Sequence, residues 1–197
     1  MIEWEMTWSP YDEPTYASVL SALHPTDVVL DIGAGDLRLA RRMAAVVRQV
    51  VAWETQPDVL EQGAALPLPD NLAPVLTDAR QEPIPSGVNV AVLLMRHCTN
   101  FRLYVEKLAA AGCRWLLTNA RWGLDVERVD LWVERVPFTA VSLGWFACRC
   151  GHTGFVPGPP EMLTPEIEGF IHEVYDCPAC RCRQPATNDM PPITNNQ

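Results

Sequence analysis

The chain has 197 residues, of which 48% are hydrophobic, and its formal net charge at pH 7 is −9. This length is sufficient for one α/β core with a small appendage, and the apolar content is typical of a folded rather than a disordered protein. The negative charge opposes broad, non-specific binding of nucleic acid, which depends on many Lys and Arg contacts to phosphates, although it leaves a local basic patch open.

Two features of the sequence bear on its cellular location. No apolar run reaches the roughly 18 residues of a membrane span, and the acidic, Trp-containing segment 1–10 lacks the basic start and apolar centre of a signal peptide. We therefore expect a cytoplasmic protein without a membrane span. In the reducing cytoplasm the seven cysteines favour metal ligation or isolated thiols over disulfides.

The first predicted element is an amphipathic helix over residues 14–23, with Pro14 in its first turn. Tyr16 lies on the apolar face of this helix, and Tyr11 precedes it. We expect both aromatic side chains to pack against the core. The alternative is that they form part of a lid over a ligand.

The following segment, residues 28–45, predicts a strand, a glycine turn and a helix, which is the beginning of a βαβ unit. The turn contains Gly33 and Gly35, and Asp31 precedes it at the end of the strand. Because glycine has no Cβ, a ligand can approach the backbone of such a turn closely. The helix beyond the turn offers free backbone N–H groups. This turn is therefore the candidate binding site.

The spacing of Asp31, Gly33 and Gly35 resembles motif I of the class I S-adenosylmethionine-dependent methyltransferases, (D/E)-x-G-x-G-x-G, with Leu37 at the place of the third glycine. The dinucleotide fingerprint G-x-G-x-x-G would need a glycine where Arg38 stands. The resemblance implies an α/β fold with a Rossmann-like, doubly wound, mostly parallel sheet. It also implies S-adenosylmethionine as the cofactor, with Asp31, Gly33 and Gly35 in its binding site and the acid near the cofactor's ammonium group.

Two further acids follow predicted strands. Residues 49–53 form the second strand, and Glu54 follows about twenty residues after the glycines, where a carboxylate can accept hydrogen bonds from both ribose hydroxyls. Nicotinamide-dependent enzymes share this acid, so Glu54 does not separate the two cofactors. A short third strand over residues 75–77 leads to Asp78, which the resemblance assigns to the amine of the adenine ring.

The most apolar run, residues 88–95, predicts a fully buried strand that ends at Arg96-His97-Cys98. Ligands of parallel sheets bind beyond the carboxyl ends of the strands, so this exit is expected to face the transferred methyl group. Because histidine side chains titrate near neutral pH, His97 is the candidate general base; a hydrogen bond within the loop is the alternative. The exit lacks the (D/N/S)-P-P-(Y/F) motif of amine-methylating nucleic-acid enzymes, which disfavours that acceptor.

A helix over residues 101–111 and a fifth strand over residues 113–119 continue the alternation of strand and helix. Residues 129–136 alternate apolar and charged side chains, which predicts a further, half-exposed strand. The alternation predicts one Rossmann-like domain over residues 1–143 with a helical segment at its start, and the motif I resemblance implies that it is of the methyltransferase type.

Five of the seven cysteines lie in the last quarter of the chain. A C-x-C-G turn and, some 26 residues later, a C-P-x-C turn look like the two knuckles of a zinc ribbon. The predicted ligands are Cys148, Cys150, Cys177 and Cys180, and Cys182 or His152 is a possible substitute for one of them. A closed four-thiolate site leaves no position for an activated water, so the zinc ion would be structural and would supply folding energy.

These patterns predict a zinc-ribbon-like β element over residues 144–183 and a disordered tail over residues 184–197. The preferred function is an S-adenosylmethionine-dependent methyltransferase whose acceptor is unknown, with RNA or protein favoured by the ribbon. One alternative is a non-catalytic adaptor, in which the ribbon binds a partner and the Rossmann-like body is a scaffold. A nicotinamide-dependent oxidoreductase is the third hypothesis. The sequence indicates no oligomeric state.

Overall fold

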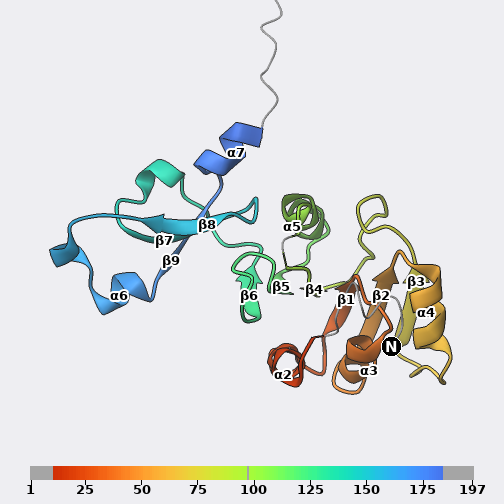
Figure 1. Cartoon of the computed structure of the whole chain (residues 1–197). Helices are drawn as coiled ribbons and strands as arrows, with labels where there is room; N and C mark the ends of the chain where they lie inside the picture. Colours follow the sequence, from red (N-terminus) through yellow and green to blue (C-terminus); the bar gives the residue numbers. More distant parts are fainter. Residues whose placement is uncertain (1–10, 97, 184–197) are drawn as a thin grey trace, which may run out of the picture. The chain divides into compact units, whose positions relative to one another are not determined.

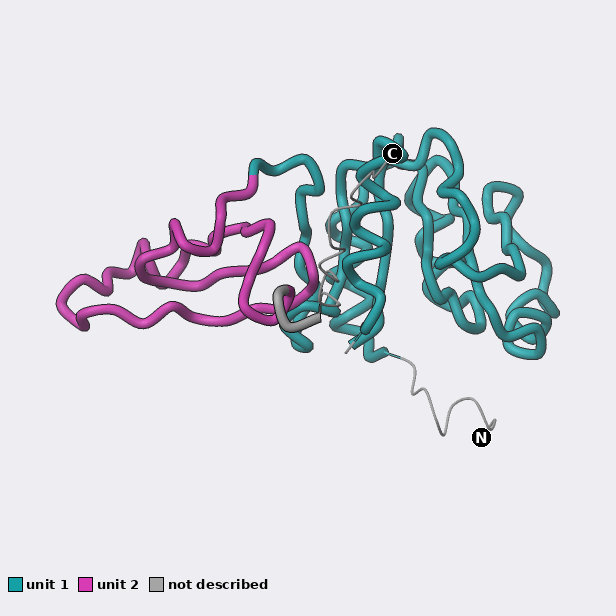
Figure 2. Tube along the Cα trace, turned by 90° about the horizontal axis from the view of Figure 1, so that it is seen from above, with its two compact units in different colours: residues 1–134 teal, residues 135–197 magenta. Residues whose placement is uncertain are grey.

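The computed structural model describes residues 11–96 and 98–183. The chain divides into two compact units, residues 1–134 and residues 135–197 (Figure 2). Residues 135–143, assigned above to the first domain, group with the second unit. Within the described part of the chain, no helix has the length and apolar character needed to cross a membrane.

A six-stranded sheet forms the centre of the first unit, in the order β3-β2-β1-β4-β5-β6 (Figure 1). Neighbouring strands are parallel except β5 and β6, which are antiparallel. The strands are β1 (Val28–Ile32), β2 (Gln49–Glu54), β3 (Leu72–Leu76), β4 (Val90–Leu93), β5 (Trp115–Thr118) and β6 (Glu127–Asp130). The strand order reverses between β1 and β4, and ligands of open α/β sheets bind beside such a switch point. The predicted doubly wound, mostly parallel sheet is thus confirmed.

Helices cover both faces of this sheet. They are α2 (Glu13–Ser21), α3 (Arg38–Ala44), α4 (Pro57–Ala64) and α5 (Phe101–Ala110). One apolar cluster joins Val19 of α2 and Met43 of α3 to Val29 of β1, whereas a second joins Leu108 of α5 to Leu30. Val29 and Leu30 face opposite sides because successive residues of a strand alternate. Figure 1 accordingly shows α5 on one side of the sheet and α2 and α3 on the other.

Several strands differ in extent from their sequence predictions: β3 begins earlier than predicted and β5 is shorter, and two others differ most. The buried strand predicted over residues 88–95 forms ladder pairs only over Val90–Leu93, all four of which are buried. The half-exposed strand predicted over residues 129–136 is β6, which ends at Asp130, since the backbone turns there with Val133 N donating to Asp130 O. Both strands nevertheless lie where the alternation of elements places them.

The second unit contains a three-stranded sheet in the order β8-β7-β9. A hairpin pairs β7 and β8 antiparallel, and β9 lies parallel to β7 on its other side. Its elements are η1 (Phe138–Ala140), β7 (Gly144–Cys148), β8 (Thr153–Val156), η2 (Pro160–Met162), α6 (Pro165–Glu168), β9 (Ile171–Val174) and α7 (Pro178–Arg183). The first cysteine turn lies at the β7–β8 hairpin, in keeping with the predicted β element, whereas the second begins a short helix. Pro178 suits that first helical turn, because its missing N–H has no helical partner there.

Candidate functional site

The turn between β1 and α3 has a backbone that only glycine adopts easily. Gly33 and Gly35 have φ values of +77° and +57°, in the left-handed region where a Cβ is strained. The N–H groups of Gly33 and Ala34 both donate to the carbonyl of Trp53, at 2.9 Å each. Leu37, at the place of the third motif glycine, also has a positive φ of 64° and is fully buried. The position therefore keeps a glycine-like backbone while its side chain packs in the core.

Asp31 lies at the foot of this turn, near the carboxyl end of β1, and is only 4% exposed. Its Oδ2 atom has no hydrogen-bond partner among the described residues. Burial, and to a smaller extent the negative charge of Glu54, raise the pKa of Asp31 to about 7. A buried carboxylate without a partner is unfavourable unless a ligand satisfies it. The chemistry that fits here is a positively charged hydrogen-bond donor, such as the ammonium group of the implied cofactor.

Glu54 ends β2 and is tied by hydrogen bonds to the same turn. Gly35 N donates to its Oε2 at 2.9 Å, while Thr55 N and Gln56 N donate to Oε1 at 2.7 and 2.9 Å. A carboxylate accepts about four hydrogen bonds in all. Because Thr55 Oγ1 also approaches Oε1 at 3.2 Å, the remaining capacity is mainly on Oε2. That atom, on the side of the glycine turn, is the one left for a ribose hydroxyl.

Asp78 lies two residues after the end of β3. The backbone of this segment stays beside β2, since Thr77 N donates to Glu54 O at 2.8 Å. Both carboxylate oxygens of Asp78 accept from Nε of Arg80 at 2.9 Å. Hydrogen bonds from the Arg80 guanidinium and backbone lower the pKa of Asp78 to about 2. Asp78 is thus a fixed anion at the carboxyl edge, and its contact with adenine stays a prediction.

Met95, just beyond β4, lies over the glycine turn. A Cβ built on Gly33 would come within 2.2 Å of Met95 Cε, so the methionine methyl group is in contact with the face of Gly33. Methionine has three rotatable bonds and adapts easily. Gly33 is otherwise exposed, so a ligand displaces this side chain only if it binds on the face that the Met95 methyl group contacts.

The exit of β4 continues from Met95 into Arg96 and the candidate base His97. The guanidinium of Arg96 lies 5.4 Å from the ring centre of Tyr11, whose hydroxyl donates to Leu94 O at 2.9 Å. His97 itself lies outside the described residues, so its predicted role as a general base stays a prediction.

Asn119, directly after β5, is a polar residue that the sequence patterns did not single out. It is 1% exposed, and neither its Oδ1 nor its Nδ2 has a hydrogen-bond partner within residues 11–96 and 98–183. Thr118 before it is fully satisfied, since its hydroxyl donates to Leu93 O at 2.7 Å and accepts from Ala120 N at 3.0 Å. The sequence feature that could have indicated Asn119 is its position directly after a buried strand, at the carboxyl edge of the sheet where Asp31 also lies.

The four predicted metal ligands come together in the second unit. All four sulfur atoms lie within 4.8 Å of one another, with 3.4 Å between Cys148 and Cys180 and 3.7 Å from Cys177 to Cys150 and to Cys180. Tetrahedral zinc with Zn–S bonds of about 2.3 Å requires sulfurs about 3.8 Å apart. The spacing and the donor set therefore fit a zinc ion.

The thiols also interact electrostatically. The hydrogen bond from Cys148 lowers the pKa of Cys150 to about 4, whereas that contact and burial raise the pKa of Cys148. Four neighbouring thiolates would repel one another without a cation, and a divalent ion removes that repulsion. His152 is exposed, and its ring packs 5.9 Å from that of Phe146. His152 is not part of the four-cysteine cluster. The side chain of Cys182, the other possible substitute, lies outside the described residues.

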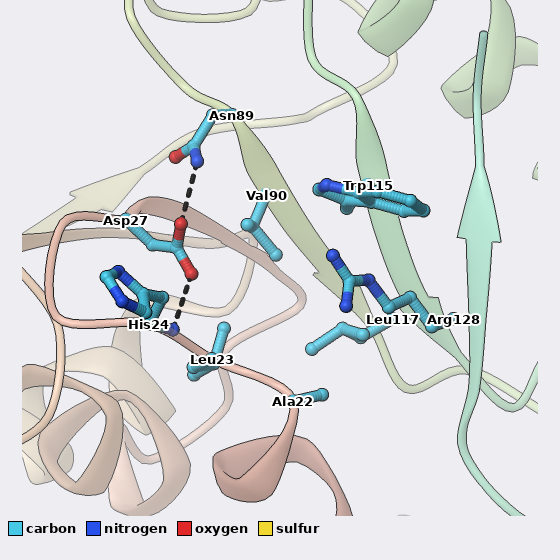
Figure 3. A pocket seen from close by; sticks show the side chains of 9 residues that line it. All are labelled: Ala22, Leu23, His24, Asp27, Asn89, Val90, Trp115, Leu117 and Arg128. Atoms are coloured by element: carbon cyan, nitrogen blue, oxygen red, sulfur yellow. Dashed lines mark hydrogen bonds between the residues drawn. The ribbon is translucent and has the colours of Figure 1, made fainter.

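A cavity of about 380 Å³ lies at the opposite edge of the first unit's sheet, at the amino ends of β1, β4 and β5 (Figure 3). The carboxylate of Asp27 in its wall accepts from His24 N and from Asn89 Nδ2, each at 2.7 Å. Asp27 is therefore satisfied within the wall, while the Arg128 guanidinium stacks on Trp115 at 3.7 Å from the ring centre. This cavity is separate from the glycine turn, which lies at the carboxyl edge.

No protein-family model matches the chain, and no curated protein matches it significantly. Methyltransferases are frequent among the solved structures that resemble it. The 23S rRNA methyltransferase ErmE is 25% identical over 55% of this chain and 46% of its own, with a TM-score of 0.45. The DhpI–SAH complex is 17% identical over 59% of this chain and 61% of its own, with a TM-score of 0.49. Precorrin 8W decarboxylase of Methanobacterium thermoautotrophicum is 19% identical over 56% of this chain and 63% of its own, with a TM-score of 0.48. The chain thus spans less than two thirds of each of these proteins.

Proposed function

We propose that the first unit is an S-adenosylmethionine-dependent methyltransferase that binds its cofactor at the turn between β1 and α3. The observation that carries this proposal is the buried, unpartnered Oδ2 of Asp31 beside two glycines with positive φ. The proposed cofactor-binding residues are Asp31, Gly33, Gly35, Glu54 and Asp78. All of them follow or end neighbouring parallel strands, at the edge where such sheets bind ligands.

The electrostatics of the turn favour a cationic cofactor over a dinucleotide. Two buried carboxylates, Asp31 and Glu54, lie at the turn. Glu54 is common to both classes of site, but a pyrophosphate placed beside Asp31 would be repelled by its carboxylate. Arg38 at the start of α3 does not offset this charge, since its guanidinium pairs with Asp36. S-adenosylmethionine brings an ammonium and a sulfonium group, which these carboxylates attract.

The bound cofactor supplies a methyl group on a positively charged sulfur. The protein's own contribution is to bind and orient the two reactants, and alignment alone can account for a large part of the rate enhancement. In this proposal Asp31 holds the amino acid end of the cofactor, and Glu54 Oε2 holds the ribose. The acceptor approaches from the ends of β4 and β5, and His97, the residue after Arg96 in the sequence, is the proposed base.

The second unit is proposed to bind one structural zinc ion through Cys148, Cys150, Cys177 and Cys180. A site closed by four thiolates has no place for substrate or water. The ion would instead join the β7–β8 hairpin to the start of α7, because each contributes two of the ligands. The three-stranded sheet has few core residues of its own, and the metal would supply part of its folding energy.

One observation favours the adaptor as a second candidate function. Gly33 is exposed, with the Met95 methyl group against one side of it, whereas Glu54 is only 6% exposed, so little of the proposed ribose-binding carboxylate is open to a ligand. A scaffold whose pocket is vestigial would have the same features. The two functions differ in whether Met95 moves aside for a cofactor.

Calorimetry on the zinc-loaded chain tests this choice with three ligands. S-adenosylmethionine and S-adenosylhomocysteine are expected to bind and NAD is not. The variant Asp31→Ala should lose binding without unfolding, whereas Asp70→Ala, which removes an exposed acid, should bind normally. Absence of binding by all three ligands would support the adaptor, and binding of NAD alone would support the oxidoreductase.

A further inference from the structure

The side chain of Asn119 has hydrogen-bonding capacity that the folded chain does not use. Its amide offers two donor hydrogens and an acceptor oxygen, yet both polar atoms are buried and unpartnered within the described structure. Folded proteins rarely leave such groups unpaired, and each exception needs an explanation. A bound ligand that completes the hydrogen bonds is one such explanation.

Asn119 is held at the edge where the proposed chemistry takes place. It follows the last ladder pair of β4 and β5, Leu93 with Thr118, and the Thr118 hydroxyl bonds across that pair. Strand β4 separates β5 from β1, and neighbouring strands lie about 4.8 Å apart. The amide is therefore about 10 Å along the sheet from the glycine turn. That spacing is suited to an acceptor group lying beside a cofactor at β1.

The exit of β4, next to Asn119, presents an aromatic ring and a cation. Arg96 is exposed, its guanidinium stacks on the ring of Tyr11, and its charge interacts with the nearby carboxylate of Asp12. The hydroxyl of Tyr11 is fixed on Leu94 O, so the pair is anchored directly beyond β4. A guanidinium supported in this way is suited to bind a phosphate.

We propose that the acceptor bound at this edge is a nucleotide, with the Asn119 amide on the edge of its base and Arg96 on its phosphate. An Asn amide pairs in bidentate fashion with a base that carries a donor next to an acceptor, as adenine does. A peptide carboxamide would match Asn119 but would leave Arg96 without a role, which favours the nucleotide. This inference rests on the proposed methyltransferase function and specifies its substrate class.

A stability measurement tests whether Asn119 is reserved for a ligand. In the full, zinc-loaded chain, Asn119→Leu should melt at the same temperature as the parent or a few degrees higher, since no hydrogen bond is lost. The matched control is Asn89→Leu, which removes the partner of Val28 N and of Asp27 Oδ1 and should melt lower. An equal fall for Asn119→Leu would show a structural partner and overturn the proposal.

A binding measurement tests the ligand class. The ¹⁵N-labelled chain, saturated with S-adenosylhomocysteine, is titrated with the four ribonucleoside 5′-monophosphates and, separately, with N-acetylglutamine amide. At least one nucleotide should shift the side-chain amide signal of Asn119, and its Kd should weaken at least about tenfold in Asn119→Leu. Arg96→Gln should weaken the nucleotide more than the corresponding nucleoside. S-adenosylhomocysteine affinity should be unchanged in both variants.

Two results would overturn the nucleotide proposal while leaving the methyltransferase in place. One is normal binding of S-adenosylhomocysteine with no nucleotide shift; the other is a shift caused only by the glutamine amide. If S-adenosylhomocysteine itself does not bind, the methyltransferase proposal fails. The same titration is then run on the ligand-free chain, where an unmoved Asn119 signal rejects the nucleotide site independently.

Discussion

The backbone N–H of Gly35 donates a 2.9 Å hydrogen bond to Oε2 of Glu54, which joins the glycine turn after β1 to the end of β2. This contact connects two elements of the proposed site that are 19 residues apart in the chain. Because Glu54 also accepts from the backbone of Thr55 and Gln56, its position is set by the fold without a ligand. The proposed ribose-binding group is thus preorganised, and Met95, whose methyl group contacts one face of Gly33, is the part of the proposed site expected to move.

Gly33→Ala should abolish cofactor binding and destabilise the fold. At a φ of +77° a Cβ costs about 1–2 kcal/mol of backbone strain, and here it also meets the Met95 methyl group. The control is Gly87→Ala, at φ +83° with no atom within 4 Å of the added Cβ. Urea unfolding should show this loss in Gly87→Ala and at least as large a loss in Gly33→Ala, whereas calorimetry should show normal S-adenosylhomocysteine binding only in Gly87→Ala. Normal binding by Gly33→Ala would place the ligand elsewhere.

The raised pKa of Asp31 gives both stability and binding a pH dependence. Burial moves the folded-state pKa from 3.8 to about 7, so between these values the folded chain holds a proton that the unfolded chain has lost. The contribution to the free energy of unfolding is therefore full below about pH 4 and decreases as pH rises toward 7. Asp31→Asn should remove this slope from chemical unfolding curves recorded between pH 5 and 8.

Affinity for a cationic ligand should follow the opposite course. An ammonium group binds the ionised form of Asp31, so S-adenosylhomocysteine should bind more tightly as pH rises to about 7, by at most about tenfold per pH unit. Calorimetry at several pH values measures this. A flat profile in the parent chain, equal to that of Asp31→Asn, would contradict the assigned contact.

Met95→Ala should strengthen cofactor binding. The parent side chain lies on one face of Gly33 and is displaced by a ligand that binds there, while the shortened one leaves that face open. We expect a several-fold tighter Kd for S-adenosylhomocysteine and a faster association rate in stopped-flow measurements. Met162→Ala, which truncates an exposed methionine of the second unit, should leave both unchanged. An unaltered association rate in Met95→Ala would mean that Met95 does not gate the site.

Zinc removal should affect the two units differently. The purified chain should contain one zinc ion per molecule by inductively coupled plasma mass spectrometry, and Cys150→Ser should lose it. Cys98→Ser, outside the sulfur cluster, should retain the ion. Limited proteolysis of the metal-free chain is expected to cut within residues 135–183 and to spare the first unit. Equal proteolysis with and without zinc would contradict a structural role for the metal.

Much of the architecture was readable from local patterns. The β-branched run before Asp31 and the continuous apolar run of β4 predicted buried parallel strands, because such strands are covered on both faces. The cysteine spacing predicted which four sulfurs approach one another. The sequence did not predict helix α7, because a C-P-x-C segment is equally compatible with a turn. The backbone of the structure shows that Pro178 is the first residue of a helix.

The features missed at the site depend on contacts between distant segments. The position of Met95 over Gly33 follows from the neighbouring places of β4 and β1 and from side-chain packing beyond the strand ends. The unpaired state of Asn119 is a property of its surroundings, since the same residue at an exposed strand end would be satisfied by water. Leu37 likewise adopts a left-handed backbone that its residue type disfavours, because its buried side chain fixes it in the core.

The most direct test of the proposed site is a crystal structure of the chain grown with S-adenosylhomocysteine. We expect the ligand at the β1–α3 turn, with its amino group on Asp31 Oδ2, a ribose hydroxyl on Glu54 Oε2, and the Met95 side chain turned away from Gly33. A structure with the ligand bound at another place, or with Met95 still on Gly33 and no ligand at saturating concentration, would contradict the proposal.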